Sequence, residues 1–217
     1  MAVIREFFPD RESWLANRNS YLGASEISCT IGIGFMSSLA LWQEKLGIKK
    51  HTDLSTNERV QFGNDAEPVL RDLYRIMYPQ NKLLFTPFLV VRQDDPQYGF
   101  LSDTPDGEIV EGGTNRFGLY ESKTATCLSK QDWDNWRDKV PQKYYCQICQ
   151  GMYCGDYEFA EIFAMLRNAD GDAEIRRYHF ERSDCEESIQ ELKEAGRKFW
   201  DHVLSGTLPP APIPTHF

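Results

Sequence analysis

Apolar positions at helical spacing predict helices in the first and last thirds of the chain. The segment Ser38–Leu46 is amphipathic, and Gly47 ends it. A longer helix is predicted for Asn57–Tyr78, with a kink or a restart at Pro68, because a proline ring opposes a continuous helix. The other predicted helices are Asp10–Asn17, one beginning with Ser25 near its N-cap, Gln131–Trp136, Tyr144–Tyr153, and a last one that a Ser183-x-x-Glu186 capping box opens and Gly206 ends.

The hydrophobic pattern changes its period in the middle of the chain. The predicted strands are Pro87–Arg92, Tyr98–Ser102, Glu108–Val110, Phe117–Thr124, Phe159–Leu166 and Glu174–Phe180. Turn sequences at Thr104–Gly107 and Gly112–Asn115 predict that the first four strands form a small antiparallel meander. The fold class predicted is α+β, with a central mixed sheet flanked by helices.

Length and composition limit the choice further. The 217 residues predict one domain over residues 1–208, followed by an extended proline-rich tail over 209–217. Hydrophobic residues make up 41% and charged residues 26%, which excludes a disordered or collagen-like chain. The net charge of −9 excludes a simple basic DNA-coating protein. A DNA-binding role then requires the basic residues to gather at one cleft, where Arg18, Lys123 and Lys130 are expected.

The N-terminus and the cysteines indicate the compartment. The start MAVIREFFPD lacks a basic segment followed by an apolar one, and no window is long enough for a membrane span, so we expect a cytoplasmic protein. Cys146, Cys149 and Cys154 form a C-x2-C-x4-C run. An iron–sulfur cluster normally needs four cysteine ligands, so the favoured interpretation is that these cysteines pack in a helical core.

One group of residues carries candidate chemistry. Asp106 lies in a Pro-Asp-Gly turn, and Glu121 and Lys123 follow in the next strand. Residues two apart on a strand face the same side, so Glu121 and Lys123 point together. Two carboxylates suit Mg²⁺ or Mn²⁺, which activates water for phosphoryl chemistry, and Lys123 would orient or deprotonate that water. An exposed hairpin with a charged face is the alternative for this pattern alone.

The surrounding motifs resemble a known family. Asp106…Glu121-Ser122-Lys123 resembles the core of the PD-(D/E)XK nucleases. The flanking residues resemble the lambda-exonuclease-like, YqaJ-type viral recombinases over about residues 10–165. The flanking motifs, in chain order, are Trp14 with Arg18, Leu22-Gly23-Ala24-Ser25-Glu26, Leu41-Trp42-Gln43-Glu44-Lys45-Leu46-Gly47, Gly63-Asn64-Asp65-Ala66-Glu67, and Pro141-Gln142-Lys143-Tyr144-Tyr145-Cys146-Gln147.

The resemblance implies a role for each matching residue. Asp106 and Glu121 resemble the main metal ligands, with the Ser122 carbonyl beside them, and Glu67 resembles a further carboxylate of the metal site. Lys123 resembles the catalytic lysine. Gln147 resembles the helix glutamine that supports the site. Arg18 and Ser25 resemble a pocket for a terminal 5′-phosphate. A further basic residue expected after the catalytic strand has no clear counterpart, and Lys130 is the nearest candidate. Thr124-Ala125 stands where the family often has Cys-Pro.

The resemblance also implies an activity. The expected function is a Mg²⁺-dependent 5′-to-3′ exonuclease on linear double-stranded DNA, with Mn²⁺ substituting for Mg²⁺. It would leave 3′ overhangs for a single-strand annealing protein of a phage or prophage recombination system in a bacterial host. Similar family members form homotrimer rings around DNA. The alternatives are an endonuclease or nickase with the same fold, and a non-catalytic DNA-binding adaptor.

Overall fold

The chain is described from a computed structural model, which covers residues 2–51 and 56–212. Its strands are β1 (Val3–Phe7), β2 (Leu22–Gly23), β3 (Lys82–Leu84), β4 (Leu89–Gln93), β5 (Leu101–Ser102), β6 (Gly107–Val110), β7 (Phe117–Thr126), β8 (Phe159–Arg167) and β9 (Ala173–Glu181). Its helices are α1 (Arg11–Asn17), α2 (Ile27–Thr30), α3 (Ser38–Lys45), α4 (Glu58–Met77), α5 (Lys130–Asp134), α6 (Gln142–Gly155) and α7 (Arg182–Ser205), with short 3-10 turns η1 (Arg18–Ser20) and η2 (Ala24–Glu26).

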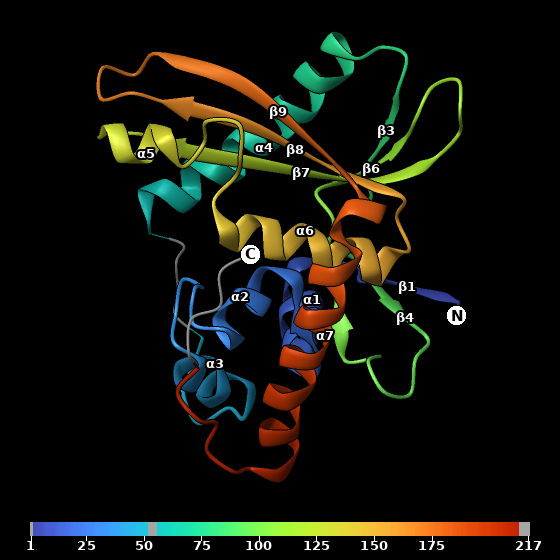
Figure 1. The fold of residues 1–217 in the computed structure, drawn as a ribbon, viewed down its shortest axis with the longest axis vertical. Coiled ribbons are helices and arrows are strands. Elements are labelled where there is room, and N and C mark those ends of the chain that lie inside the picture. The colour runs from blue at the N-terminus through green and yellow to red at the C-terminus, as the bar shows by residue number, and fades with distance from the viewer. Residues whose placement is uncertain (1, 52–55, 213–217) are drawn as a thin grey trace.

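A five-stranded mixed sheet forms the centre of the fold, with the strand order β3-β6-β7-β8-β9 (Figure 1). β7 and β8 run parallel, and the other neighbours in this sheet are antiparallel. The connection between β7 and β8 contains α6, as a parallel pair requires. The mixed α+β fold with a central sheet between helices, predicted from the sequence, is confirmed.

Helices cover the two faces of this sheet. On one face, Leu70 and Tyr74 of α4 pack against Tyr120 and Phe163 of the sheet. On the other face, α6 packs against Leu119 and its neighbours, and α7 packs on α6 (Figure 1). Tyr120 faces α4 and Leu119 faces α6, so the alternation of a strand sends Glu121 and Lys123 towards α6.

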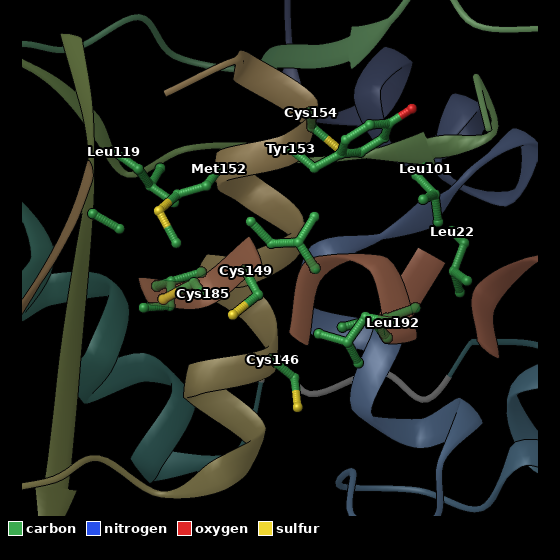
Figure 2. Packing of buried hydrophobic residues seen from close by; sticks show 14 of the residues in the cluster. Leu22, Leu101, Leu119, Cys146, Cys149, Met152, Tyr153, Cys154, Cys185 and Leu192 are labelled. Atoms are coloured by element: carbon green, nitrogen blue, oxygen red, sulfur yellow. The ribbon is translucent and has the colours of Figure 1, made fainter. Parts of the chain in front are cut away.

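The cysteine run lies in the hydrophobic core. Cys146, Cys149 and Cys154 are fully buried on α6, beside Met152, Leu119 and Leu192 (Figure 2). All three are free thiols. The predicted packing of these cysteines in a helical core is confirmed.

The predicted meander is wrong. β4 pairs with β1 and β5 pairs in parallel with β2, so β6 and β7 form the one hairpin of the predicted meander. A single antiparallel bridge, between Val91 and Asp103, joins β4 to the residue after β5. The partners of β4 and β5 lie about eighty residues earlier in the chain, and a local turn pattern does not detect such pairing. The strands β1 and β3 were not predicted, because they are short and carry little periodicity.

Two helix starts also differ from the prediction. Gly23, not Ser25, is the N-cap of η2, because its N–H donates to Oε2 of Glu26 at 2.9 Å. α7 begins at Arg182, directly after β9, with Glu181 as its N-cap and without a capping bond, so Ser183 lies inside its first turn. α4 continues through Pro68 without a restart.

The end of the described chain is irregular. Residues 207–212 form no helix or strand, and Pro209, Pro210 and Pro212 line a groove along α7. The rest of the predicted tail, 213–217, lies outside the described residues, and the division into a domain and a tail stays a prediction. Within 2–51 and 56–212, no helix is both long enough and apolar enough to cross a membrane.

Candidate active site

The candidate site lies where β7 extends beyond its neighbour β6. β6 pairs with β7 only over residues 117–120, whereas β8 pairs with β7 over residues 118–126. Residues 121–126 of β7 therefore have one edge that no described strand covers. Glu121, Ser122 and Lys123 occupy the first half of this edge.

Glu121 is the most enclosed acid of the site. Its side chain is only 3% exposed, and its Oε1 accepts hydrogen bonds from Lys123 Nζ and, at 2.7 Å, from Gln147 Nε2 of α6. Its other oxygen, Oε2, is buried and has no hydrogen-bond partner among the described residues. An unpaired buried carboxylate oxygen is costly, and a cation would satisfy it.

Asp106 reaches the same edge from the turn before β6. Its Oδ2 accepts from the backbone N–H and from the hydroxyl of Ser122, each at 2.9 Å. The carboxylate thus takes the place of a missing strand partner. The turn needs Gly107 beside Asp106, because a Cβ there would lie 2.9 Å from Leu83 and 3.1 Å from the Leu84 carbonyl oxygen.

Glu67 comes from α4 and lines the same pocket as Asp106 and Glu121. It forms an ion pair with Arg71, one helical turn later. Arg71 also donates to the carbonyl oxygen of Asp106 at 3.3 Å, and its guanidinium lies 3.7 Å from the centre of the Phe85 ring. Arg71 therefore connects α4 to the turn that carries Asp106.

Burial and the charge of Asp106 raise the pKa of the carboxyl groups near it. Burial and the charge of Asp106 raise the pKa of Glu67, although Arg71 opposes the shift. Burial and the charge of Asp106 raise the pKa of Glu121 well above its usual range. Burial would lower the pKa of Lys123, but the charges of Glu121 and Asp106 outweigh it and raise this pKa. Lys123 is thus held as an ammonium, whereas the acids around it are costly to ionise together unless a further cation joins them.

Arg18 and Ser25 line the same pocket, which has a volume of about 560 Å³. Arg18 forms an ion pair with Glu26 at 3.3 Å, and its guanidinium lies 5.7 Å from the centre of a Trp14 ring. Glu26 is itself buried and pairs with Lys45 Nζ at 2.7 Å. Glu26 and Lys45, which belong to two separate sequence motifs, therefore fix the position of Arg18 together.

The structure does not bring Lys130 to this pocket. Lys130 is exposed at the first position of α5 and is absent from the pocket's lining. The role of Lys130 in binding the phosphate stays a prediction.

Sequence reasoning missed two residues of the site: Arg71, which pairs with Glu67, and Asp103, which lines the pocket. Arg71 follows Glu67 by four residues, a spacing that places the two on one helix face. Asp103 precedes Asp106 by three residues, is 3% exposed and has an unpaired buried Oδ2. Burial and the charge of Asp106 raise the pKa of Asp103 to about 7.

The donor set fits a divalent cation chemically, since carboxylate and carbonyl oxygens are the ligands of Mg²⁺. The three predicted ligand carboxylates share one pocket, but each also contacts a partner within the chain: Arg71, Ser122, or Lys123 with Gln147. Within the described residues, no group of three or more His, Cys, Asp or Glu side chains is gathered closely enough to hold a metal ion. The unpaired Oε2 of Glu121 is the atom most suited to bind one.

Comparison with solved structures supports the class of fold. The structure is similar to an alkaline exonuclease from Laribacter hongkongensis, with a TM-score of 0.67 and 18% identity over 90% of this chain and 93% of that one. The same exonuclease in complex with dAMP gives a TM-score of 0.63 at 18% identity, with the same coverage. A phage-related exonuclease from Haemophilus somnus 129PT gives 0.55 at 15% identity, over 86% of this chain and 96% of that one. No curated protein sequence matches the chain.

The fold and the site together define a nuclease of the lambda-exonuclease type, an enzyme that hydrolyses DNA. The model of the YqaJ-like viral recombinase domain matches residues 13–158, which include the motifs of the candidate site. The chain belongs to the YqaJ-like viral recombinase family.

Proposed function

We propose that this chain is a Mg²⁺-dependent exonuclease that degrades one strand of linear double-stranded DNA from its 5′ end and leaves a 3′ overhang. The observation that carries the proposal is the buried, unpartnered Oε2 of Glu121, in a pocket with Asp106 and beside Lys123. Burying a carboxylate oxygen without a partner is costly, and a bound cation would remove that cost. A carboxylate kept half-unpaired among other acids is typical of a site that awaits a cation.

Asp106 and Glu121 would hold the cation, with the Ser122 carbonyl and Glu67 beside them. When bound, a divalent cation would polarise the phosphodiester and lower the pKa of an attacking water. Mn²⁺ has similar ligand preferences and would substitute for Mg²⁺.

Two further side chains of this site would assist the reaction, Lys123 at the phosphate and Gln147 through Glu121. Lys123 holds a proton on Nζ and would stabilise negative charge on the phosphate. Gln147 fixes the orientation of Glu121 through its hydrogen bond to Oε1. Glu121 and Lys123 would therefore keep one geometry during the reaction.

Arg18 and Ser25 support dependence on a DNA end. A guanidinium binds a phosphate through two parallel hydrogen bonds, and Glu26 and Trp14 already orient that of Arg18. A terminal 5′-phosphate held there would place a nearby phosphodiester at Glu121, because both groups line one pocket. An end that lacks the phosphate would bind less well.

The family supports the biological setting. We propose that the 3′ overhangs serve a single-strand annealing protein in phage-type recombination, in the cytoplasm of a bacterial host. We also propose a homotrimer ring around DNA, by resemblance to similar family members. The exonuclease similar to this chain was solved with dAMP, a mononucleotide, which supports stepwise removal of nucleotides.

The experiment compares linear duplex with closed circular duplex, with Mg²⁺ or with a chelator, and with 5′-phosphate or 5′-hydroxyl ends. We expect digestion of linear duplex only, in Mg²⁺ only, and faster with 5′-phosphate. Cleavage of closed circles would favour an endonuclease or nickase with the same fold. Binding without any cleavage would favour a DNA-binding adaptor.

A further inference from the structure

A second pocket lies at the far end of the uncovered edge of β7, where Thr124, Ala125 and Thr126 line it. Its volume is about 310 Å³. Three cations from separate elements surround it: Arg59 of α4, Lys143 of α6 and Arg167 at the end of β8. No acidic side chain is among the described residues of its lining.

No described carboxylate neutralises these cations. Within residues 2–51 and 56–212, no carboxylate forms an ion pair with Arg59, Lys143 or Arg167. Arg167 instead stacks on Phe62, with its guanidinium carbon 3.5 Å from the ring centre. Stacking leaves the edge of a guanidinium free to donate hydrogen bonds. Three unpaired cations around one pocket favour an anion.

The backbone of this edge adds donors. Ser122 directs its N–H away from β8 and donates it to Asp106. The N–H groups of Thr124 and Thr126 point to the same side, because the direction repeats every two residues along a strand. An exposed sheet edge of this kind, with hydroxyl side chains and cations around it, is suited to bind a phosphate.

The second pocket adjoins the candidate active site. The ring of Tyr144 lines it and lies with its centre 5.1 Å from Nζ of Lys123 and 4.9 Å from Nζ of Lys143. The pocket that contains Glu121 and Arg18 lies on the other side of Lys123 along β7. A single DNA strand could thus follow the edge of β7 from Arg18, past Glu121 and Lys123, to Arg167.

We propose that the pocket formed by Arg59, Lys143 and Arg167 binds a backbone phosphate of the DNA strand being cut, on the side of the scissile bond opposite to the Arg18 pocket. This inference rests on the proposed function, since it takes DNA as the ligand. The pocket would hold the strand on both sides of the reacting phosphate. Such positioning lowers the entropic cost of reaching the reactive geometry.

The test is a measurement of DNA affinity in a chelator, where no cleavage competes. Fluorescence anisotropy with a labelled linear duplex over a series of salt concentrations would compare the wild-type protein with Arg59→Ala, Lys143→Ala and Arg167→Ala. Each variant should weaken binding about tenfold and reduce the slope of log K against log salt by about 0.7–0.9. Lys82→Ala is the matched control, because Lys82 is an exposed cation on β3, away from this pocket, and it should change neither quantity.

Arg59 is exposed and Lys143 lies in the first turn of α6, so neither alanine variant removes a core contact. Arg167→Lys keeps a cation there and should recover part of the affinity lost in Arg167→Ala. Affinity and salt slope at the wild-type level in both Arg59→Ala and Lys143→Ala would overturn the inference. If the variants lose affinity but the wild-type protein does not digest linear duplex in Mg²⁺, the exonuclease proposal fails and the phosphate pocket stands.

Discussion

Gln147 donates a 2.7 Å hydrogen bond to Oε1 of Glu121, while the other oxygen of this carboxylate is buried and unpartnered. Gln147 lies on α6 and Glu121 on β7, so the packing of a helix on a sheet determines the direction of the free oxygen. Glu121 lines one pocket with Asp106 and Glu67, so the site favours a cation beside these carboxylates.

Glu121→Gln is expected to abolish stabilisation of the protein by Mg²⁺. For a ligand that binds only the folded state, a concentration about ten times Kd adds about 1.4 kcal/mol, or about 3–6 °C in Tm for a chain of this size. Thermal unfolding with and without Mg²⁺ measures this shift in Tm. Glu187→Gln, which changes an exposed acid on α7, should retain the full shift. An equal Mg²⁺ shift in both variants would show that Glu121 does not hold the cation.

Asp103→Asn is expected to stabilise the protein at high pH. The folded-state pKa of Asp103 is raised to about 7 from a usual value of 3.8, so the charged form is the unfavourable one. The penalty is absent below the unfolded pKa, grows as the pH rises from about 4 to about 7, and is complete above it. The variant should gain about 1–3 kcal/mol at pH 8 and about a quarter of that at pH 4.5.

Urea unfolding in a chelator at the two pH values measures this difference. A gain that is the same at both values, or a loss at pH 8, would show that Asp103 is not a strained carboxylate.

Arg18→Ala is expected to remove the preference for 5′-phosphorylated ends. A hydrogen bond to a charged group contributes about 1.5–3 kcal/mol, so cleavage of phosphorylated ends should fall about 10- to 150-fold. Cleavage of 5′-hydroxyl ends should fall much less. Arg18→Lys should give an intermediate result, because an ammonium lacks the paired donors of a guanidinium. The control is Lys198→Ala on α7, and an unchanged preference in Arg18→Ala would place the 5′-phosphate elsewhere.

Two helical glycines should respond in opposite directions to alanine. At Gly151 of α6, a Cβ would lie 2.6 Å from Leu119 Cδ2 and 2.8 Å from Asp103 Oδ2, so Gly151→Ala should destabilise by about 1–3 kcal/mol. At Gly63 of α4, the nearest atom would be Thr124 Oγ1 at 3.5 Å, so Gly63→Ala should stabilise by about 0.5–1 kcal/mol. Urea unfolding of the two variants checks the signs. A stabilising Gly151→Ala would mean that α6 does not approach β7 as closely as described here.

The sequence predicts local elements well and long-range pairing poorly. The hydrophobic stripe of α4 is strong enough to identify a long helix despite Pro68. The pairing of Val3 with Gln93, by contrast, leaves no local signal in either segment. The five residues of β1 form a strand because each of them pairs with a residue of β4.

The candidate site was predictable where it follows ordered motifs and not where it depends on packing. The strand spacing of Glu121 and Lys123 predicts their common direction, and the resemblance adds Glu67 and Gln147. The buried environment that raises the pKa of Asp103 depends on α6 and β7 together, so no local pattern predicts it. Lys130, named only for its proximity in sequence to Lys123, is exposed on α5 and does not line the pocket of Glu121 and Asp106.

The most direct test of the central claim is digestion of a linear duplex that carries one label at a 5′ end or at a 3′ end, by the wild-type protein and by Lys123→Met. In Mg²⁺, the wild-type protein should release the 5′ label early as a short product and retain the 3′ label on a shortening strand. Lys123→Met should bind the duplex but cleave at least about 100-fold more slowly. Early release of the 3′ label, or cleavage by Lys123→Met at the wild-type rate, would contradict the account.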